Sequence, residues 1–146
     1  MKLNIYDYIN NYIESSNDIG IGDYHKEISK KNLHHNIDCI SHAIQSKSNK
    51  KNKQLSVAIY LERRNFYILS MFATWKLGGY FIPLNTAWPI ERINTLINHC
   101  NSDIVICHKD GNYQQKNALF IEDINFKSTP PNIAKSNSKP SDLCYI

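Results

Sequence analysis

The sequence predicts an α/β fold, a parallel βαβαβ layer preceded by two helices. Three short apolar runs rich in strand-forming residues, at 55–61, 80–85 and 103–107, alternate with two segments of helical length, at 62–77 and 89–100. Strands that alternate with helices within about fifty residues are joined by right-handed crossovers into a parallel sheet. A chain of 146 residues has the size of one domain or of part of one.

Composition excludes two broad classes of protein. Hydrophobic residues make up 42% of the chain and charged residues 21%, which is too apolar for a disordered chain. The net charge of +4 is well below that of a dedicated nucleic-acid binder, so we expect no nucleic acid among the partners. The four cysteines form no Cys-x-x-Cys pair and no zinc-finger spacing; they are Cys39, Cys100, Cys107 and Cys144.

The sequence also predicts a compartment. The opening residues MKLNIYDYINNYI make a poor signal peptide, because Asn and Asp interrupt their apolar residues. We therefore expect a cytoplasmic protein with reduced cysteines. The apolar run at 67–84 is long enough for a membrane span, but Lys76 lies near its middle and Gly78, Gly79 and Pro83 interrupt it. A buried helix followed by a buried strand explains it better, and we expect no membrane contact.

Residues 1–45 are predicted to be a helical lead-in. A first helix is expected over 3–15, where the apolar residues form one stripe at helical spacing: Ile5, Tyr8, Ile9, Tyr12 and Ile13. A turn follows at 16–22, and Asp23 is the expected N-cap of a second helix that runs to Gln45. This second helix would bury Leu33, Ile37, Ile40 and Ile44.

Residues 46–54 read SKSNKKNKQ and predict an exposed basic loop, with a patch for phosphate or nucleic acid as the alternative. Residues 55–124 are the predicted βαβαβ core. Its first helix, 62–77, is apolar almost all round and must be covered on more than one side. Gly78 then suits a left-handed helix C-terminus, and Pro89 and Glu91 suit the start of the next helix.

The C-terminal part is less regular. The stretch ALFIEDI at 118–124 predicts a short strand, which would close the core. Residues 125–141 carry three prolines and many polar residues, so they predict a linker or mobile loop. Residues 142–146, DLCYI, predict the start of another buried strand.

Three groups of residues on the helices and strands invite a chemical interpretation. His35, Cys39 and His42 share one helix face and offer zinc ligands, but no fourth ligand is evident, so we interpret them as a half-exposed polar face. The pairs His99-Cys100 and Cys107-His108 suggest Cys–His nucleophilic catalysis. No third, orienting group accompanies them, so we interpret these cysteines as core thiols.

Two further features have simple structural interpretations. The pair Gly78-Gly79 lies after a helix and before a strand, which is the wrong place for a phosphate loop, so it predicts a cap and turn. Trp75, Tyr80 and Trp88 could offer a platform on which bases stack, but they are interleaved with aliphatic residues and favour core packing.

The assembled pattern resembles a known family. The segment WKLGGYFIPLN at 75–85 resembles the Lys-x-Gly-Gly-x-Tyr/Phe-x-Pro-Leu block of the adenylate-forming (AMP-binding) synthetases, which include acyl-CoA synthetases, luciferases and nonribosomal peptide synthetase adenylation domains. The tract TAWPIERINTLINHCNSDIVIC at 86–107 is similar to the Pro, Glu-Arg and Leu-rich helix that follows in the family. PSDLCYI at 140–146 resembles the strand that leads into the family's phosphate loop, and 23–44 resembles an upstream helix.

The resemblance implies the first part of the N-terminal lobe of such an enzyme, left incomplete. In the family the Ser/Thr/Gly-rich phosphate loop would begin directly after Ile146, and the adenine, magnesium, ribose and catalytic-lysine motifs come later. No catalytic, cofactor-binding or metal-binding residue is therefore carried over to this chain. ATP and Mg²⁺ are implied only for the complete enzyme, as is a small-molecule carboxylate substrate.

Two functions follow from this resemblance. The first is an N-terminal piece of an ATP-dependent carboxylate-adenylating ligase, inactive alone, with the missing remainder as a partner in trans. The second is a non-catalytic βαβ binding or interaction module derived from that scaffold. In either case we expect exposed apolar surface, with the strand at 142–146 unpaired on at least one edge.

Overall fold

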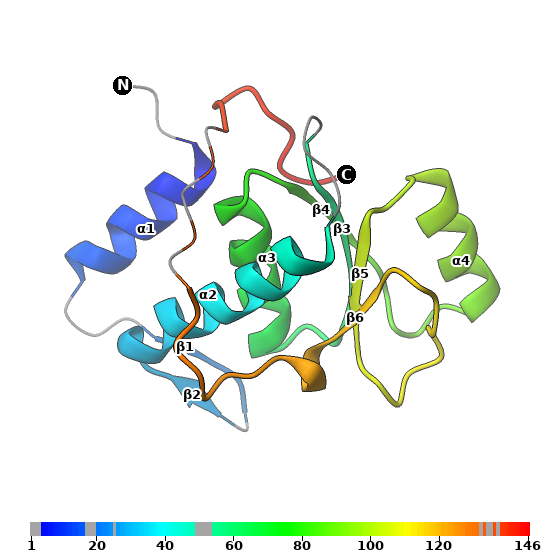
Figure 1. Ribbon diagram of the computed structural model, residues 1–146, viewed down its shortest axis with the longest axis horizontal. Helices are drawn as coiled ribbons and strands as arrows, with labels where there is room; N and C mark the ends of the chain where they lie inside the picture. Colours follow the sequence, from blue (N-terminus) through cyan, green and yellow to red (C-terminus); the bar gives the residue numbers. More distant parts are fainter. Residues whose placement is uncertain are drawn as a thin grey trace.

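The computed structural model describes residues 4–16, 20–24, 26–48, 54–131, 133, 136 and 138–146. Its centre is a four-stranded parallel sheet in the order β4-β3-β5-β6 (Figure 1). The strands are β3 (Ser56–Tyr60), β4 (Tyr80–Pro83), β5 (Ile104–Cys107) and β6 (Ala118–Phe120). The predicted α/β class and parallel layer are confirmed.

Strand β3 is the central strand of this layer. Every residue of β3 is buried, because β4 and β5 flank it and helices cover both of its faces. Its Ala58 lies opposite Ile82 of β4 on one side and Val105 of β5 on the other. A strand without a polar face reads as a continuous apolar run, which is why the sequence LSVAIYL identifies it so clearly.

Helices cover the two faces of the sheet unequally. Alternate strand residues such as Ile59 and Ile106 share one apolar core with α1 (Ile5–Ser15), α2 (Lys30–Lys47) and α3 (Asn65–Lys76). The intervening residues, such as Ala58 and Val105, share the second core with α4 (Ile90–His99). Figure 1 shows α1, α2 and α3 on one side of the sheet and α4 on the other.

Helix α3 lies between α2 and the sheet, as its apolar circumference predicts. Its Leu69 and Ala73 are fully buried and belong to the core that α2 completes. The Lys76 ammonium forms an ion pair with the Asp38 carboxylate of α2, which ties the two helices together. The helix begins at Asn65 rather than at 62, because the Arg64 amide bonds back to the Glu62 carbonyl in a turn (2.7 Å).

The glycine pair ends α3 as predicted. Gly78 has a positive φ of +73°, and its amide donates to the Trp75 carbonyl at 2.9 Å. The Gly79 amide donates to the Thr74 carbonyl at 2.9 Å, so the two bonds form a Schellman motif. A Cβ on Gly79 would approach the Leu55 carbonyl oxygen to 2.8 Å, so only glycine lets β3 and β4 begin this close together.

The second helix starts later than predicted. Asp23 does not cap it; its carboxylate accepts the Lys26 amide at 3.0 Å inside a hairpin of β1 (Ile21–Gly22) and β2 (Glu27–Ile28). Short polar side chains bond to nearby amides in turns as readily as at helix ends, which explains the wrong assignment. Helix α2 instead begins after Ser29 and continues to Lys47, two residues past the predicted end.

The apolar stripe of α1 is only partly buried. Ile13 is buried and Ile9 is half-buried as predicted, but Ile5, Tyr8 and Tyr12 are exposed by 40%, 64% and 68%. The helix instead buries Tyr6 and Asp7, because Asn4 and Asp7 form a reciprocal capping box at its N-terminus. The Asn4 amide also donates to the Ser138 hydroxyl at 2.8 Å, which fixes the rotation of the helix.

The C-terminal segment ends at the edge of the sheet. Strand β6 is shorter than the predicted 118–124, because a 3-10 helix, η1 (Ile121–Asp123), follows it. Within 125–141 the described residues form no helix or strand. Tyr145 makes a parallel bridge to Phe81 of β4, and Leu143, Tyr145 and Ile146 are exposed by 46%, 59% and 57%. The exposed apolar surface expected here is present, but the prediction of a buried strand at 142–146 is wrong: the segment forms a single bridge, and no described element covers its apolar side chains.

Two other predictions concern the basic loop at 46–54 and the apolar run at 67–84. Most of the basic loop predicted at 46–54 lies outside the described residues, although Lys47 closes α2. The apolar run at 67–84 divides between α3 and β4. In the described part of the chain, no helix is both long and apolar enough to cross a membrane.

Alkaline pH should destabilise the fold. Burial, followed by the nearby Glu122 carboxylate, raises the pKa of the Cys107 thiol to about 11, and burial together with nearby carboxylates raises the pKa of Tyr6 to about 12. The unfolded chain loses these protons near 9.0 and 10.0, so the folded state holds more protons above that range. Stability is therefore complete below about pH 8 and falls as the pH rises toward 12. Urea unfolding at a series of pH values measures this; a free energy of unfolding that rose over the range would contradict it.

Candidate functional site

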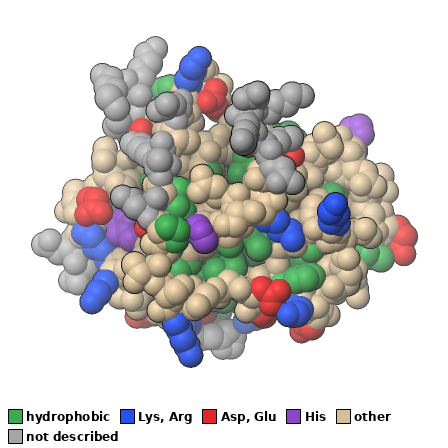
Figure 2. All heavy atoms as spheres, viewed as in Figure 1, with side chains coloured by type: hydrophobic (Ala, Val, Ile, Leu, Met, Phe, Trp, Pro, Cys, Tyr) green, Lys and Arg blue, Asp and Glu red, His purple; other side chains and the backbone are tan. Residues whose placement is uncertain are grey.

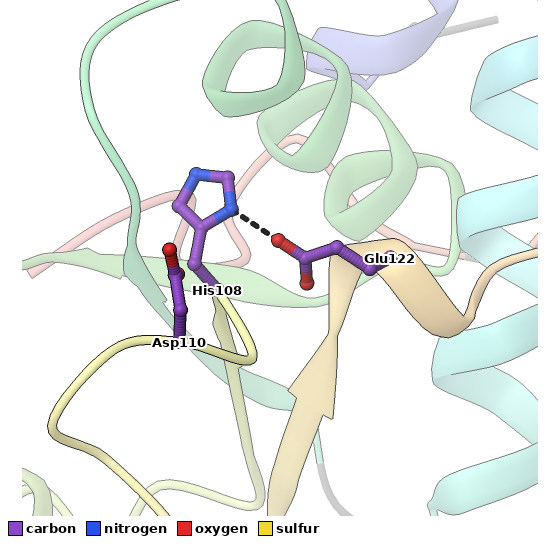
Figure 3. Close-up of side chains that lie close together, drawn as sticks. All are labelled: His108, Asp110 and Glu122. Atoms are coloured by element: carbon purple, nitrogen blue, oxygen red, sulfur yellow. Dashed lines mark hydrogen bonds and ion pairs between the residues drawn. The ribbon is translucent and has the colours of Figure 1, made fainter.

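A group of polar side chains lies at the carboxyl edge of the parallel sheet. Open parallel sheets bind ligands at this edge, because loops that follow neighbouring strands meet there. His108 comes directly after the last residue of β5, and Glu122 comes two residues after the last residue of β6. Figure 3 shows the side chains of His108 and Glu122 turned toward each other, with Asp110 beside them.

Hydrogen bonds hold these side chains in place. His108 Nδ1 lies 2.6 Å from Glu122 Oε1, and the Lys109 backbone amide donates to Glu122 Oε2 at 3.0 Å. The Lys109 ammonium bonds to the Asp123 carboxylate at 2.8 Å. One ligand atom from each of His108, Asp110 and Glu122 lies within 4.8 Å of the others. The arrangement is thus an exposed cluster of one imidazole and two carboxylates.

The electrostatics of the cluster favour ionised groups. Burial alone would raise the pKa of Glu122, but hydrogen bonds from His108 and from the backbone outweigh it and lower the pKa of that carboxyl. The hydrogen bond from Lys109 to Asp123, with the charge of Asp123, raises the pKa of the Lys109 ammonium. Glu122 is therefore anionic and Lys109 cationic at neutral pH.

A cavity of about 540 Å³ opens beside this cluster. It lies between the β1-β2 hairpin, α2, the end of β3 and the start of α3, and His108 contributes to its wall. The apolar part of the lining comes from Ile28, Leu61, Phe66 and Phe126. The volume is within the range of small-molecule sites, and the lining combines apolar walls with a few polar groups.

Of the three residues considered as a zinc site, His35 and Cys39 lie close together and His42 has a separate neighbour. His35 Nε2 lies 2.7 Å from the Phe126 carbonyl and 3.6 Å from Cys39 Sγ. A ring nitrogen that donates to a carbonyl is not available to a metal. Cys39 is buried, and burial raises the pKa of its thiol. His42 is exposed and lies beside Ser46 (3.5 Å), so the helix face has separate local contacts.

The residues of the two Cys–His pairs have different surroundings. The Cys107 thiol is buried and points to the Tyr113 carbonyl at 3.8 Å, and the high pKa of about 11 keeps it protonated. A protonated core thiol is a poor nucleophile. His99 is exposed at the end of α4, and Cys100 is the C-cap residue beside it.

The aromatic residues considered as a stacking platform lie on opposite faces of the sheet. Trp75 packs in the core that α2 and α3 share, where its indole N–H donates to the Cys144 carbonyl at 2.9 Å. Tyr80 and Trp88 pack in the core with α4, and the Arg92 guanidinium lies 4.1 Å from the centre of the Trp88 ring. On the face drawn in Figure 2, Lys and Arg side chains are scattered among acidic and polar ones.

The sequence singles out His108 only through the pair Cys107-His108, and it does not indicate Asp110 and Glu122 as neighbours of that imidazole. The position of His108 at the end of a strand was visible in the sequence, and so was that of Glu122 after the next apolar run. Their contact depends on β5 and β6 being paired neighbours, with Cys107 opposite Phe120. The sequence does not show that pairing directly. Residues that follow consecutive parallel strands nevertheless tend to lie at the same edge of a sheet, and this tendency could have pointed to the cluster.

Comparison with known proteins agrees with this fold. A family model described as AMP-binding enzyme matches residues 14–146. The chain is 28% identical over 93 residues to tyrocidine synthase 2 of Brevibacillus parabrevis, which covers 62% of this chain and 3% of the relative. It is 26% identical over 121 residues to the D-alanine–D-alanyl carrier protein ligase of Staphylococcus epidermidis, which covers 82% of this chain and 24% of the relative.

A solved structure shows the same fold. The N-terminal subdomain of NpsA from Klebsiella oxytoca, solved in complex with 3-hydroxyanthranilyl-AMSN, overlays on 97% of this chain and 35% of its own, with a TM-score of 0.71 and 18% identity. This chain thus spans about a third or less of the proteins that it matches here. Because the family model matches nearly the whole chain, the protein belongs to the AMP-binding enzyme family, the adenylate-forming synthetases.

Proposed function

We propose that this chain is the N-terminal scaffold of a ligase that activates a carboxylate with ATP, giving an acyl adenylate and pyrophosphate, and that it is inactive alone. The observation that carries the proposal is the parallel bridge between Phe81 and Tyr145. In the family this strand leads into the phosphate loop. The bridge aligns this segment in parallel beside β4, so a phosphate loop that followed it would begin toward the carboxyl edge of the sheet.

The described residues do not fit ATP and Mg²⁺. A triphosphate needs backbone amides at a helix N-terminus, usually in a glycine-rich turn. The Gly78-Gly79 pair lies at the C-terminus of α3, where the helix dipole is negative, and its amides already donate to Trp75 and Thr74 carbonyls. We therefore assign no step of the reaction to these residues, and propose that ATP, Mg²⁺ and the acid substrate bind only in the complete enzyme.

The proposed partner is the remainder of the enzyme, present in the cytoplasm. Two surfaces suit such a contact. One is the C-terminal segment 142–146, with its exposed Leu143, Tyr145 and Ile146. The other is the exposed stripe of α1 at Ile5, Tyr8 and Tyr12. Apolar groups of this size on a soluble protein mark surfaces that another polypeptide covers.

The second candidate function is a non-catalytic binding module. The cavity of about 540 Å³ at the carboxyl edge favours it, because residues of this chain form the cavity without any contribution from a further part of an enzyme. The reading frame after the Ile146 codon separates the two functions. A Ser/Thr/Gly-rich loop ending in Lys, there or in a neighbouring gene, supports the scaffold; a stop with no such remainder supports the module.

ATP–pyrophosphate exchange tests the inactivity of the chain. We expect the purified chain to show only background exchange with any amino acid or aryl acid, because the residues that the structure describes offer no cradle for phosphates. The D-alanine ligase of Staphylococcus epidermidis with D-alanine is the positive control. Robust carboxylate-dependent exchange by the purified chain would overturn the proposal.

A further inference from the structure

We propose that His108, Asp110 and Glu122 form a binding site for a divalent transition-metal ion of the zinc type. One ligand atom from each of the three residues lies within 4.8 Å of the others, at the carboxyl edge of β5 and β6 (Figure 3). The site does not depend on the proposed adenylation role, because no nucleotide or acid substrate takes part in it.

Paired strands set the positions of the ligands. His108 follows β5 directly, and the 3-10 helix that carries Glu122 follows β6 directly. The two strands are hydrogen-bonded neighbours with Ile106 opposite Leu119 and Cys107 opposite Phe120. His108 and Glu122 are thus anchored next to the ends of paired strands, and Asp110 lies in the turn that follows β5.

The surrounding groups orient the Glu122 carboxylate. The Lys109 amide holds Oε2 at 3.0 Å, which leaves Oε1 on the side of His108. The Lys109 ammonium bonds to Asp123 rather than to the cluster, at 2.8 Å. Three carboxylates therefore stand near a single ammonium, and this surplus of negative charge attracts a cation. Such supporting hydrogen bonds are typical of metal centres.

The spacing requires only small side-chain movements. A tetrahedral zinc-type ion with bonds of about 2.0–2.1 Å holds its ligand atoms about 3.3 Å apart. His108 Nδ1 and Glu122 Oε1 are 2.6 Å apart and must separate slightly, and the widest pair must close from 4.8 Å or less. The side chains of His108 and Glu122 are each 43% exposed, so rotation about their χ angles is unhindered by core packing.

The ligand chemistry selects the ion. One imidazole and two carboxylates suit Zn²⁺, Co²⁺ or Mn²⁺ better than Ca²⁺, which takes oxygen ligands, or Cu⁺, which takes sulfur. Three protein ligands leave further coordination positions open. The adjoining cavity, whose wall includes His108, gives room for water molecules at those positions.

A titration with Co²⁺ tests the site in the full chain. Cobalt is the probe because its absorption spectrum distinguishes nitrogen and oxygen ligands from thiolates, and the chain has four cysteines. We expect one Co²⁺ bound with visible d–d bands and no sulfur charge-transfer band. Asp110→Asn and Glu122→Gln should each weaken binding about tenfold or more. Glu62→Gln, another exposed carboxylate at the cavity, is the matched control and should leave Co²⁺ affinity unchanged.

Each outcome decides the proposal. Loss of affinity in Asp110→Asn and Glu122→Gln with no loss in Glu62→Gln supports it. Absence of saturable Co²⁺ binding, equal binding by all variants or a sulfur charge-transfer band overturns it. Circular dichroism confirms the fold of each variant; if Glu122→Gln fails to fold, Asp110→Asn alone decides, because Asp110 is exposed.

Discussion

The substitution Ile59→Asp abolishes cooperative folding. Ile59 is fully buried in β3, opposite Pro83 of β4 and Ile106 of β5, and belongs to the core shared with α2 and α3. A carboxylate there would be ionised in an apolar core without a partner, or would stay protonated and unpaired. Either state costs several kcal/mol, which is comparable to the whole stability of a small domain.

The matched control is Ile146→Asp. It makes the same change at an isoleucine that is 57% exposed, so its effect on stability should be within about 0.5 kcal/mol. The milder Ile59→Ala should cost about 2–5 kcal/mol, from lost transfer free energy and a cavity. Circular dichroism and urea unfolding measure all three. If Ile59→Asp unfolded at the same urea concentration as the unchanged chain, β3 could not be the central strand.

The second large effect concerns the ion pair between α2 and α3. Asp38→Ala should destabilise the chain by about 2–3 kcal/mol, because it leaves the Lys76 ammonium, whose side chain is only 15% exposed, without its carboxylate. The effect is smaller than for a fully buried pair, since the Asp38 side chain is 35% exposed and solvent screens it. Urea unfolding measures the change.

A double-mutant cycle isolates the pair from its packing. Lys76→Met keeps most of the apolar stem, and the double variant with Asp38→Ala removes both charges. We expect the double variant to be more stable than Asp38→Ala alone, because no buried charge remains unpaired. Additive effects of the two substitutions would show that the ion pair does not link the helices.

The core strands were predictable because each has a local cause. The runs at 55–61, 80–85 and 103–107 are continuously apolar and bounded by polar, Gly or Pro residues, which is how a strand buried on both faces reads. Gly78 could be placed for the same reason, since a left-handed residue at a helix end is a local requirement. The family resemblance rests on this same central segment.

The features that were missed depend on longer-range contacts. The hairpin at 21–28 has strands of two residues, too short to show any periodicity, and Asp23 suits its turn as well as a helix cap. The exposure of Tyr8 and Tyr12 depends on how the Asn4 capping box and Ser138 rotate α1. The cluster of His108 with Glu122 depends on the pairing of β5 with β6, which no local pattern contains.

An NMR titration with ATP tests the central claim. This claim is that the chain forms the sheet of an adenylate-forming lobe but does not bind the triphosphate of ATP. The isotope-labelled chain is titrated with ATP in constant excess Mg²⁺ while its amide spectrum is recorded. We predict a dispersed spectrum of a folded protein in which no amide moves saturably as ATP rises. Saturable shifts of amides at the carboxyl edge, such as those of Asn85 and His108, would show a nucleotide site in these residues and would contradict the account.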